Sequence, residues 1–381
     1  MKKPWFGLPG VLFLSLAVTV AAQAPRRLPV ITGAMGVNLI VEVDGTVASW
    51  GFPGGEGTYL GDGSDGSAER KLPAPIPGVR DIVGASVGHG HALLVTKDGA
   101  VLGWGRNNGC ELGVPDDRRR LTPIRIAGVS GAIQVAAGML FSAAVLTDGT
   151  VRVWGSNEEG LLANGRSGFE APCAETPVPV DGLTGVKLMV VGETDVLVLK
   201  EDGTVWGWGS NSDGELCDGT TERRNRPVQM KGIVNAVDID INGASVIVLA
   251  DGTVRMCGTS TDGRLADAAP GSKHATPFKV GGITGAVAAR TQGGSTIVRL
   301  KDGTLLGWGR GMHGSLGDGF IDRITPKPHA PTGLGPVVAH YFASNSGFAI
   351  RADGTVMAWG IYVGGPKEWA LTPIPLFKVK L

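Results

Sequence analysis

An Asp-Gly pair followed by a short hydrophobic strand that ends in Trp-Gly, or once in Cys-Gly, occurs seven times in this chain. Residues 202–209, DGTVWGWG, are its clearest copy. Asp-Gly before an alternating segment predicts a tight hairpin turn, because both central residues of a type I′ turn need a positive φ. The copies begin at Asp44, Asp98, Asp148, Asp202, Asp251, Asp302 and Asp353. Successive copies lie 49 to 54 residues apart, a period that is typical of propellers and solenoids.

A proline-led strand forms a second repeat, out of phase with the first. It also occurs seven times, from LPAPIPGV at Leu72 to TPIPLFKVKL at Thr372. In the second unit, the four expected strands fall within 81–88, 91–97, 101–105 and 123–129. Four strands per repeat are typical of a propeller blade. The sequence therefore predicts an all-β fold, a seven-bladed β-propeller with about four strands per blade.

The phase of the two repeats suggests how the ring closes. The first Asp-Gly unit has no full proline-led strand before it, and the strand from Pro373 has no Asp-Gly unit after it. We expect this C-terminal strand to complete the blade that begins near Ile31. The ring would then be closed by the C-terminal strand, and no sheet edge would remain open there.

The first residues have the pattern of a signal peptide. Lys2 and Lys3 precede an apolar run from Val11 to Val20, and small residues follow. The alternative is an uncleaved membrane anchor, which is disfavoured because a membrane span needs about 20 apolar residues. We expect cleavage after Ala22, so that residues 1–22 are the signal peptide and residues 23–381 form a single propeller. The mature protein would then be secreted, periplasmic or on the cell surface, without stable membrane insertion.

Charge and glycine content narrow the class of protein further. The chain has 35 basic and 35 acidic residues, so no net field draws it to nucleic acid. It has 62 glycines and only 18% charged residues, a composition that favours many tight turns over disorder. We expect a globular β-rich monomer that binds no nucleic acid.

Tryptophan recurs at one position of the repeat, at the end of the strand after each Asp-Gly turn. Large aromatic residues that recur at one strand position usually belong to the core. We therefore expect these side chains to pack between blades, in preference to a ring of aromatic ligand sites. The expected core tryptophans are Trp50, Trp104, Trp154, Trp208, Trp308 and Trp359, with Cys257 at the seventh place.

The stretch DGTVWGWGSNSDGELCDG, residues 202–219, resembles the regulator of chromosome condensation repeat. That repeat joins His-x-x-x-Leu, Asp-Gly-x-Val, Trp-Gly and Asn-x-x-Gly-x-Leu-Gly, and the resemblance extends over residues 31–381. It implies a seven-bladed propeller and a protein-binding role. An exported, bacterial-type member would be similar to the secreted propellers of this family, which look like inhibitors that bind an enzyme. The repeat histidine is present only as His91. Nucleotide exchange on a small nuclear GTPase is not carried over, because an exported chain without a basic tail would not meet that partner.

Two stretches resemble metal sites but do not meet the requirements of one. Asp238, Asp240 and Asn242 begin like a calcium loop, but Leu249 stands where such a loop needs glutamate. His89 and His91 can share a strand face, yet a zinc site needs three or four ligands. We therefore expect no metal, no cofactor and no catalytic residue, and a structural role for His91.

We expect at most one disulfide among the four cysteines. Cys257 occupies a core tryptophan position, so we expect it to be a buried thiol. Cys173 lies in a long loop between Cys110 and Cys217, and either of these is an eligible partner in an oxidising compartment.

Loops on a rigid scaffold are where propellers place function. We expect the long loops between each tryptophan strand and the next proline-led strand to bind a protein partner. Basic residues recur where these loops end, and two aromatic residues would supply apolar anchors. The expected partner-binding residues are Tyr59, Arg118, Arg119, Arg120, Phe169, Arg223, Arg224 and Arg323.

The leading functional hypothesis is an exported, non-enzymatic scaffold for protein–protein interaction. The first alternative is a carbohydrate or cell-wall binding module, for which the candidate exposed aromatics are Tyr59, Phe169, Tyr362 and Trp369. The second is a propeller hydrolase or lyase, since the fold alone does not define an activity.

Overall fold

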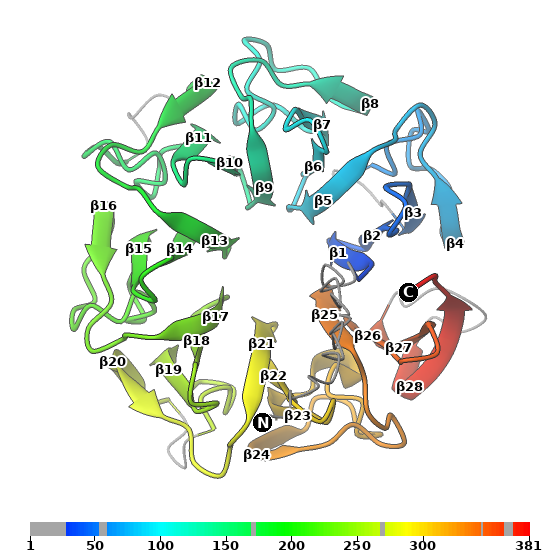
Figure 1. Ribbon diagram of the computed structural model, residues 1–381, viewed down its shortest axis with the longest axis vertical. Helices are drawn as coiled ribbons and strands as arrows, with labels where there is room; N and C mark the ends of the chain where they lie inside the picture. The colour runs from blue at the N-terminus through cyan, green and yellow to red at the C-terminus, as the bar shows by residue number, and fades with distance from the viewer. Residues whose placement is uncertain (1–27, 53–58, 169–172, 267–270, 344–345, 362–368) are drawn as a thin grey trace, which may run out of the picture.

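The computed structural model describes residues 28–52, 59–168, 173–266, 271–343, 346–361 and 369–381. The predicted signal peptide, Phe169 and Tyr362 lie outside these residues. Seven antiparallel four-stranded sheets stand around a central axis (Figure 1), and each sheet is built from one continuous stretch of chain. The predicted seven-bladed, four-stranded propeller is confirmed.

The strand bounds are as follows, from the innermost to the outermost strand of each blade. Blade 1 contains β1 (Val30–Ala34), β2 (Val37–Val41), β3 (Val47–Gly51) and β4 (Arg70–Pro75). Blade 2 contains β5 (Ile82–Val87), β6 (His91–Thr96), β7 (Val101–Gly105) and β8 (Arg120–Arg125). Blade 3 contains β9 (Ala132–Ala137), β10 (Phe141–Leu146), β11 (Val151–Gly155) and β12 (Ala174–Pro179). Blade 4 contains β13 (Val186–Val191), β14 (Asp195–Lys200), β15 (Val205–Gly209) and β16 (Arg224–Gln229).

The remaining three blades follow the same order. Blade 5 contains β17 (Ala236–Ile241), β18 (Ala244–Leu249), β19 (Val254–Thr259) and β20 (Lys273–Lys279). Blade 6 contains β21 (Ala286–Gln292), β22 (Ser295–Leu300), β23 (Leu305–Arg310) and β24 (Ile324–His329), with the short helix η1 (Met312–Gly314) after β23. Blade 7 contains β25 (Ala339–Ala343), β26 (Ser346–Ile350), β27 (Thr355–Ile361) and β28 (Trp369–Lys378).

The C-terminal strand does not complete the first blade, so this part of the prediction is wrong. β28 pairs with β27 of its own blade, with Val356 opposite Phe377. The outer place in blade 1 is already filled by β4, which pairs with β3. The first proline-led strand follows the first Asp-Gly unit and belongs to the same sheet, so no vacancy is left for another strand.

Side-chain packing between blades 7 and 1 closes the ring instead. The ring centroid of Phe377 in β28 lies 5.8 Å from that of Trp50 in β3. Phe348 in β26 contacts Trp50 edge-on at the same centroid distance. The Tyr341 hydroxyl also donates to the Pro29 carbonyl at 2.5 Å. The C-terminal strand thus contributes to closure by burying apolar surface against blade 1 and not by strand exchange.

Each Asp-Gly turn is a hairpin turn, but of another type than predicted. In blade 4 the Gly203 N–H donates to the Lys200 carbonyl at 3.0 Å, and only Gly203 of this turn has a positive φ, +77°. This pattern fits a type I turn followed by a left-handed glycine. The Asp202 carboxylate accepts from the Thr204 N–H at 2.9 Å and from its hydroxyl at 2.6 Å, which explains the Asp-Gly-Thr sequence.

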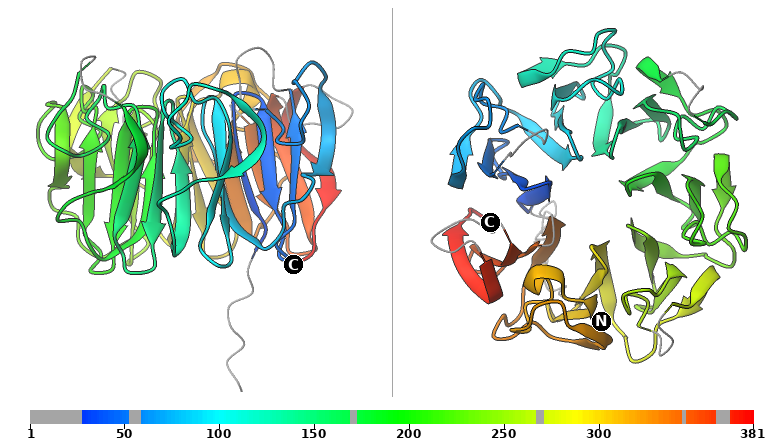
Figure 2. Two further views of the ribbon diagram at one scale, coloured as in Figure 1. Left: turned by 90° about the horizontal axis from the view of Figure 1, so that it is seen from above. Right: turned by 180° about the vertical axis from the view of Figure 1, so that it is seen from behind.

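Strand alternation gives the propeller two different faces (Figure 2). One face carries the Asp-Gly turns and the C-terminus, and we call it the Asp-Gly face. The opposite face carries the loops between the third and fourth strand of each blade, and we call it the long-loop face. No helix among the described residues is long and apolar enough to cross a membrane.

The repeated tryptophans hold neighbouring blades together. All six are fully buried, with no exposed area. In blades 2, 3, 4, 6 and 7 the indole N–H donates to a loop carbonyl of the preceding blade at 2.7–2.9 Å. The Trp208 indole, for example, donates to the Leu161 carbonyl at 2.9 Å. A buried indole needs such a partner, so the repeat supplies both the apolar contact and its hydrogen bond.

Candidate partner-binding face

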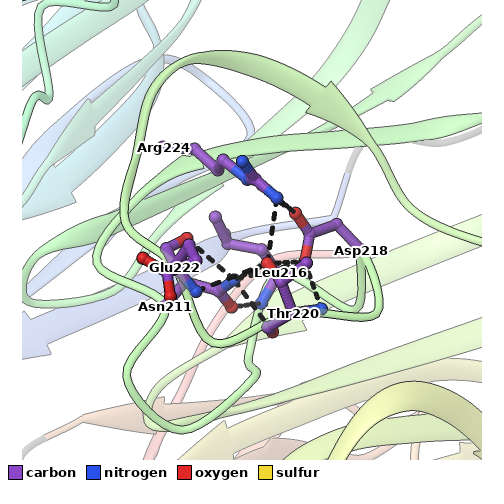
Figure 3. Close-up of polar contacts among 6 residues, drawn as sticks. All are labelled: Asn211, Leu216, Asp218, Thr220, Glu222 and Arg224. Atoms are coloured by element: carbon purple, nitrogen blue, oxygen red, sulfur yellow. Dashed lines mark hydrogen bonds and ion pairs between the residues drawn. The ribbon is translucent and has the colours of Figure 1, made fainter.

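Most of the predicted arginines make contacts that hold the loops of the long-loop face in place. Arg224 at the start of β16 contacts the Asp218 carboxylate, and its Nη2 donates to the Thr220 hydroxyl at 2.9 Å (Figure 3). Asn211 organises the same loop, because its amide oxygen accepts from the Leu216 N–H at 2.9 Å. Arg224 is therefore a structural residue of the loop as well as part of its surface.

Arg120 and Arg223 are also paired with carboxylates. Arg120 Nη2 lies 2.8 Å from Asp116 Oδ2 within the loop of blade 2. Arg223 Nε lies 2.8 Å from Glu159 Oε2, which belongs to the loop of blade 3. Exposed ion pairs of this kind contribute little to stability, about 0–1 kcal/mol. They do reduce the positive charge that these arginines present to a partner.

Tyr59 does not present the exposed apolar anchor that the sequence suggested. Its side chain is only 2% exposed. The Arg119 Nη1 donates to the Tyr59 hydroxyl at 2.6 Å, and the Tyr59 carbonyl accepts from the Trp104 indole at 2.7 Å. Tyr59 thus belongs to the contact between blades 1 and 2, and Arg119 covers it.

Arg118 and Arg323 have neither an ion pair nor, as Arg119 has, a hydrogen bond to Tyr59 among the described residues. Both are exposed on the long-loop face. The guanidinium carbon of Arg323 lies 4.5 Å from the ring centroid of Phe320, a cation–π contact. Arg323 therefore joins a patch that contains apolar side chains.

Four apolar side chains of blades 6 and 7 are exposed at the long-loop end of these blades, and we call them the blade 6–7 patch. Its members are Phe320, Ile321, Ile324 and Trp369, which are 44–50% exposed. The loop of blade 6 lies against the start of β28, because the Gly319 N–H donates to the Leu371 carbonyl at 2.9 Å. The ring of His313 contacts Trp369 edge-on at 5.6 Å.

Sequence reasoning named only Trp369 and Arg323 from this region. The signal for Phe320 and Ile321 was an apolar pair that stands between Gly317-Asp318-Gly319 and Asp322. The strand order of blades 6 and 7 places these residues and Trp369 at the same end of the two blades, on the long-loop face. Exposed apolar surface is typical of interaction sites.

The two aspartates that begin like a calcium loop have a different role. They lie on the inner strand β17 and accept hydrogen bonds from the neighbouring inner strand β21. Asp238 accepts from the Ala289 N–H at 2.8 Å and Asp240 from the Thr291 N–H at 2.8 Å. Arg290 Nη1 lies 2.9 Å from Asp238 Oδ2. Within the described part of the chain, no group of three or more histidine, cysteine or acidic side chains is arranged to hold a metal.

Asp240 and Arg290 also line the central channel. A cavity of about 270 Å³ lies there, lined by the inner strands of all seven blades. Burial raises the pKa of Asp240 to about 6, although the nearby Arg290 opposes the shift. The polar groups of this channel serve mainly to connect inner strands, as Gln134 does by hydrogen bonding both the N–H and the carbonyl of Met189.

His91 takes part in a buried hydrogen-bond chain between blades 2 and 3. Its Nε2 lies 2.7 Å from the Ser142 hydroxyl, which donates to the Glu111 carbonyl at 2.7 Å. The same carbonyl accepts from the Trp154 indole at 2.8 Å. Burial, with smaller contributions from His89 and Arg106, lowers the pKa of His91 to about 3.

The pKa of His91 predicts a loss of stability in acid. The folded protein keeps this imidazole neutral, while the unfolded chain protonates it below about pH 6.5. Its contribution to the free energy of unfolding is therefore complete above pH 6.5 and is lost as the pH falls toward 3. One such group gives a slope of up to about 1.4 kcal/mol per pH unit.

Urea unfolding of the wild type and of His91→Gln at pH 7, 6, 5 and 4 measures this contribution. Glutamine retains a donor for Ser142 but does not titrate, so its curve should be flatter. His340 is a second buried histidine with a lowered pKa, and its contribution remains in both proteins. Parallel curves for the two proteins would contradict the assignment to His91.

Two disulfides join neighbouring blades, and one of them corrects the prediction for the cysteines. Cys110 in blade 2 is bonded to Cys173 in blade 3, one of the two pairings that the sequence left open. Cys217 in blade 4 is bonded to Cys257 in blade 5, so Cys257 is not a free thiol. The sequence suggested a thiol because Cys257 replaces a core tryptophan. In the structure its partner, Cys217, lies in the long loop of the preceding blade, which packs against this position.

A seven-bladed β-propeller of four-stranded blades with a partly apolar rim of loops is thus the class of protein that the fold defines. Residues 98–145 and 202–243 match the model of the regulator of chromosome condensation (RCC1) repeat, and residues 132–161 match a second model of the same repeat. The chain therefore carries RCC1 repeats.

The curated relatives of this chain are proteins of several kinds. The chain is 27% identical over 283 residues to the human E3 ubiquitin-protein ligase HERC2, covering 70% of this chain but 6% of that protein. It is 27% identical over 360 residues to the Ultraviolet-B receptor UVR8 of Arabidopsis thaliana, covering 91% of this chain and 79% of the receptor. The chain thus spans only a small part of HERC2.

Solved structures share the fold at lower sequence identity. Prp20p from Saccharomyces cerevisiae, described with its binding properties to Gsp1p and histones, superposes with a TM-score of 0.74 at 21% identity. That match covers 89% of this chain and 87% of Prp20p. Human WBSCR16 also gives a TM-score of 0.74 at 21% identity, over 87% of this chain and 93% of that chain. These structural similarities show that the chain has the same fold as these proteins.

Proposed function

We propose that the protein is an exported, non-enzymatic scaffold that binds a protein partner through its long-loop face. The observation that carries this proposal is the blade 6–7 patch, whose four half-exposed apolar side chains lie on the long-loop face, with Arg323 in contact with Phe320. Aromatic and arginine side chains at the centre of a patch are typical of binding hot spots. Prp20p, whose fold this chain shares, is described as binding Gsp1p and histones, which supports a protein partner.

The two inter-blade disulfides support export. Disulfides persist in oxidising compartments and are rare in the cytosol. They agree with the signal-peptide pattern of residues 1–22, and the proposed location is the periplasm, the cell surface or the medium. The proposed partner surface combines the blade 6–7 patch with Arg118 and Arg323, since the other predicted arginines already hold the loops.

Ile321→Asp and Arg323→Glu should each weaken capture of the partner. Ile321 is 46% exposed, so aspartate there should not disturb the core. A central hot-spot residue contributes about 2 kcal/mol or more to binding, which corresponds to roughly thirtyfold in affinity. Capture from the exported fraction by the immobilised mature protein, followed by titration of the captured partner, measures the change.

Val234→Asp is the matched control, because Val234 is 58% exposed but lies on the Asp-Gly face, between β16 and β17. It should leave the affinity unchanged. If the control abolishes capture while Ile321→Asp does not, and both variants melt like the wild type, the interface lies on the opposite face.

A further inference from the structure

Trp206 stands outside the tryptophan core of the repeat. It precedes Trp208 by two residues on β15, so both side chains face blade 3. Trp208 is fully buried, whereas Trp206 is only partly buried at the edge of the same cluster. The equivalent residues in other blades are aliphatic or basic, for example Leu102, Arg152 and Leu306. Packing between blades therefore does not require an indole here.

A cavity of about 190 Å³ lies beside Trp206 at the boundary of blades 3 and 4, toward the Asp-Gly face. The connection between β12 and β13 forms one wall, and β14, β15 and β16 supply the others. Its lining residues are Asp181, Gly182, Leu183, Lys200, Trp206, Arg226 and Pro227. Pockets for drug-sized ligands are larger, about 300–1,000 Å³, so this cavity fits a single ring.

The charged groups of this cavity are not used in ion pairs among the described residues. Lys200 Nζ lies 5.6 Å from the ring centroid of Trp206. Arg226 Nη2 makes one long hydrogen bond, 3.4 Å to the Asn164 carbonyl. This is unlike Arg120, Arg223 and Arg224 on the long-loop face, which are paired with carboxylates. Lys200 is thus the cationic group beside the indole, whereas the Arg226 guanidinium lies against Asn164 and Gly165 in the long loop of blade 3.

We propose that this cavity binds a pyranose ring that carries a carboxylate, such as a uronic acid residue of an acidic polysaccharide. The C–H face of the sugar would pack on the indole of Trp206, whose N–H is already directed at the Thr204 hydroxyl at 3.2 Å. Lys200 would bind the sugar carboxylate, and Asp181 would accept hydrogen bonds from its hydroxyl groups.

The dimensions of the cavity favour a sugar over an acidic peptide. A peptide is usually bound in a groove that takes several side chains, or along a sheet edge. Here one aromatic surface, one cation and one acceptor line a space that fits one ring. The site is on the other side of the molecule from the blade 6–7 patch, so the two proposals are independent.

Calorimetric titration with a galacturonic acid trisaccharide, and with a galactose trisaccharide as the neutral control, tests the proposal on the oxidised mature protein. We expect the acidic trisaccharide to bind and the neutral one to bind at least about tenfold more weakly. Trp206→Leu and Lys200→Gln should each weaken binding at least about tenfold. Leucine is the residue at this position in blades 2 and 6, so Trp206→Leu should fold and melt like the wild type.

Arg152→Leu, at the equivalent position of blade 3, is the matched control and should leave binding unchanged. Ile321→Asp should also leave it unchanged, which separates this site from the partner-binding face. The proposal is overturned if the acidic trisaccharide does not bind, if Trp206→Leu binds it as well as the wild type, or if the neutral sugar binds equally. Displacement of the trisaccharide by a poly-glutamate peptide of higher affinity would assign the site to an acidic peptide instead.

Discussion

Trp208→Ala should lower the free energy of unfolding by about 3–5 kcal/mol, the usual effect of truncating a large aromatic residue in a packed core. The indole is fully buried between blades 3 and 4 and donates to the Leu161 carbonyl at 2.9 Å. Truncation therefore removes apolar contacts and leaves a buried carbonyl without its donor. Urea unfolding followed by circular dichroism measures the change.

Trp369→Ala is the control for this prediction. Trp369 is 44% exposed, so its truncation should change the free energy of unfolding by less than about 1 kcal/mol. If Trp208→Ala were as stable as this control but failed to bind the partner, the repeated tryptophans would be ligand residues and not core.

The fold could be predicted because each repeat carries its own local signals. The Asp-Gly-Thr sequence defines one turn, the alternating strand with tryptophan defines a buried face, and the fixed period repeats both. The sequence did not show in the same way how the last blade closes the ring against the first. The strand from Pro373 can pair with blade 1 only if the strand at Leu72 joins blade 2, and it pairs with blade 7 if the strand at Leu72 joins blade 1. Both arrangements have the same sequence repeat, so the sequence does not distinguish them.

The candidate sites were less accessible to sequence reasoning, because they depend on contacts across blades. Tyr59 looked like an exposed loop aromatic, but Arg119, sixty residues later, covers it. The blade 6–7 patch combines a loop at Phe320 with a strand that begins at Trp369. Trp206 was visible in the sequence as the first of the two tryptophans of DGTVWGWG, but its pocket involves the connection between β12 and β13 in the preceding blade.

The cysteine pair of blades 4 and 5 replaces the usual contact between a loop and a tryptophan. Cys217 has a φ of +55°, and glycine or alanine stands at its position beside the other tryptophans, as at Gly113 and Gly317. A Cβ at Gly113 would lie 3.1 Å from Trp154, and one at Gly317 would lie 3.0 Å from Trp359. A longer side chain fits at Cys217 only because Cys257 stands where the next blade would have an indole.

Replacing both cysteines by alanine should lower the free energy of unfolding by about 4 kcal/mol, because the bond closes a loop of 40 residues in the unfolded chain. The double variant Cys217→Gly/Cys257→Trp should recover much of this loss, since the indole would fill the space and donate to the Glu215 carbonyl, which the Cys257 Sγ already approaches at 3.6 Å. Cys257→Trp alone should be less stable than this double variant by about 1–3 kcal/mol, as overpacking predicts.

Urea unfolding under non-reducing conditions, with peptide mapping of the wild type, distinguishes these cases. The Cys110–Cys173 bond is left in place in every variant, so differences report on blades 4 and 5 alone. If the double alanine variant matched the wild type, the bond would contribute nothing to stability. If the Gly/Trp variant were no more stable than the alanine variant, the two residues would not be complementary. Recovery by the Gly/Trp variant would show that the disulfide and the buried indole are alternative solutions to the same inter-blade contact.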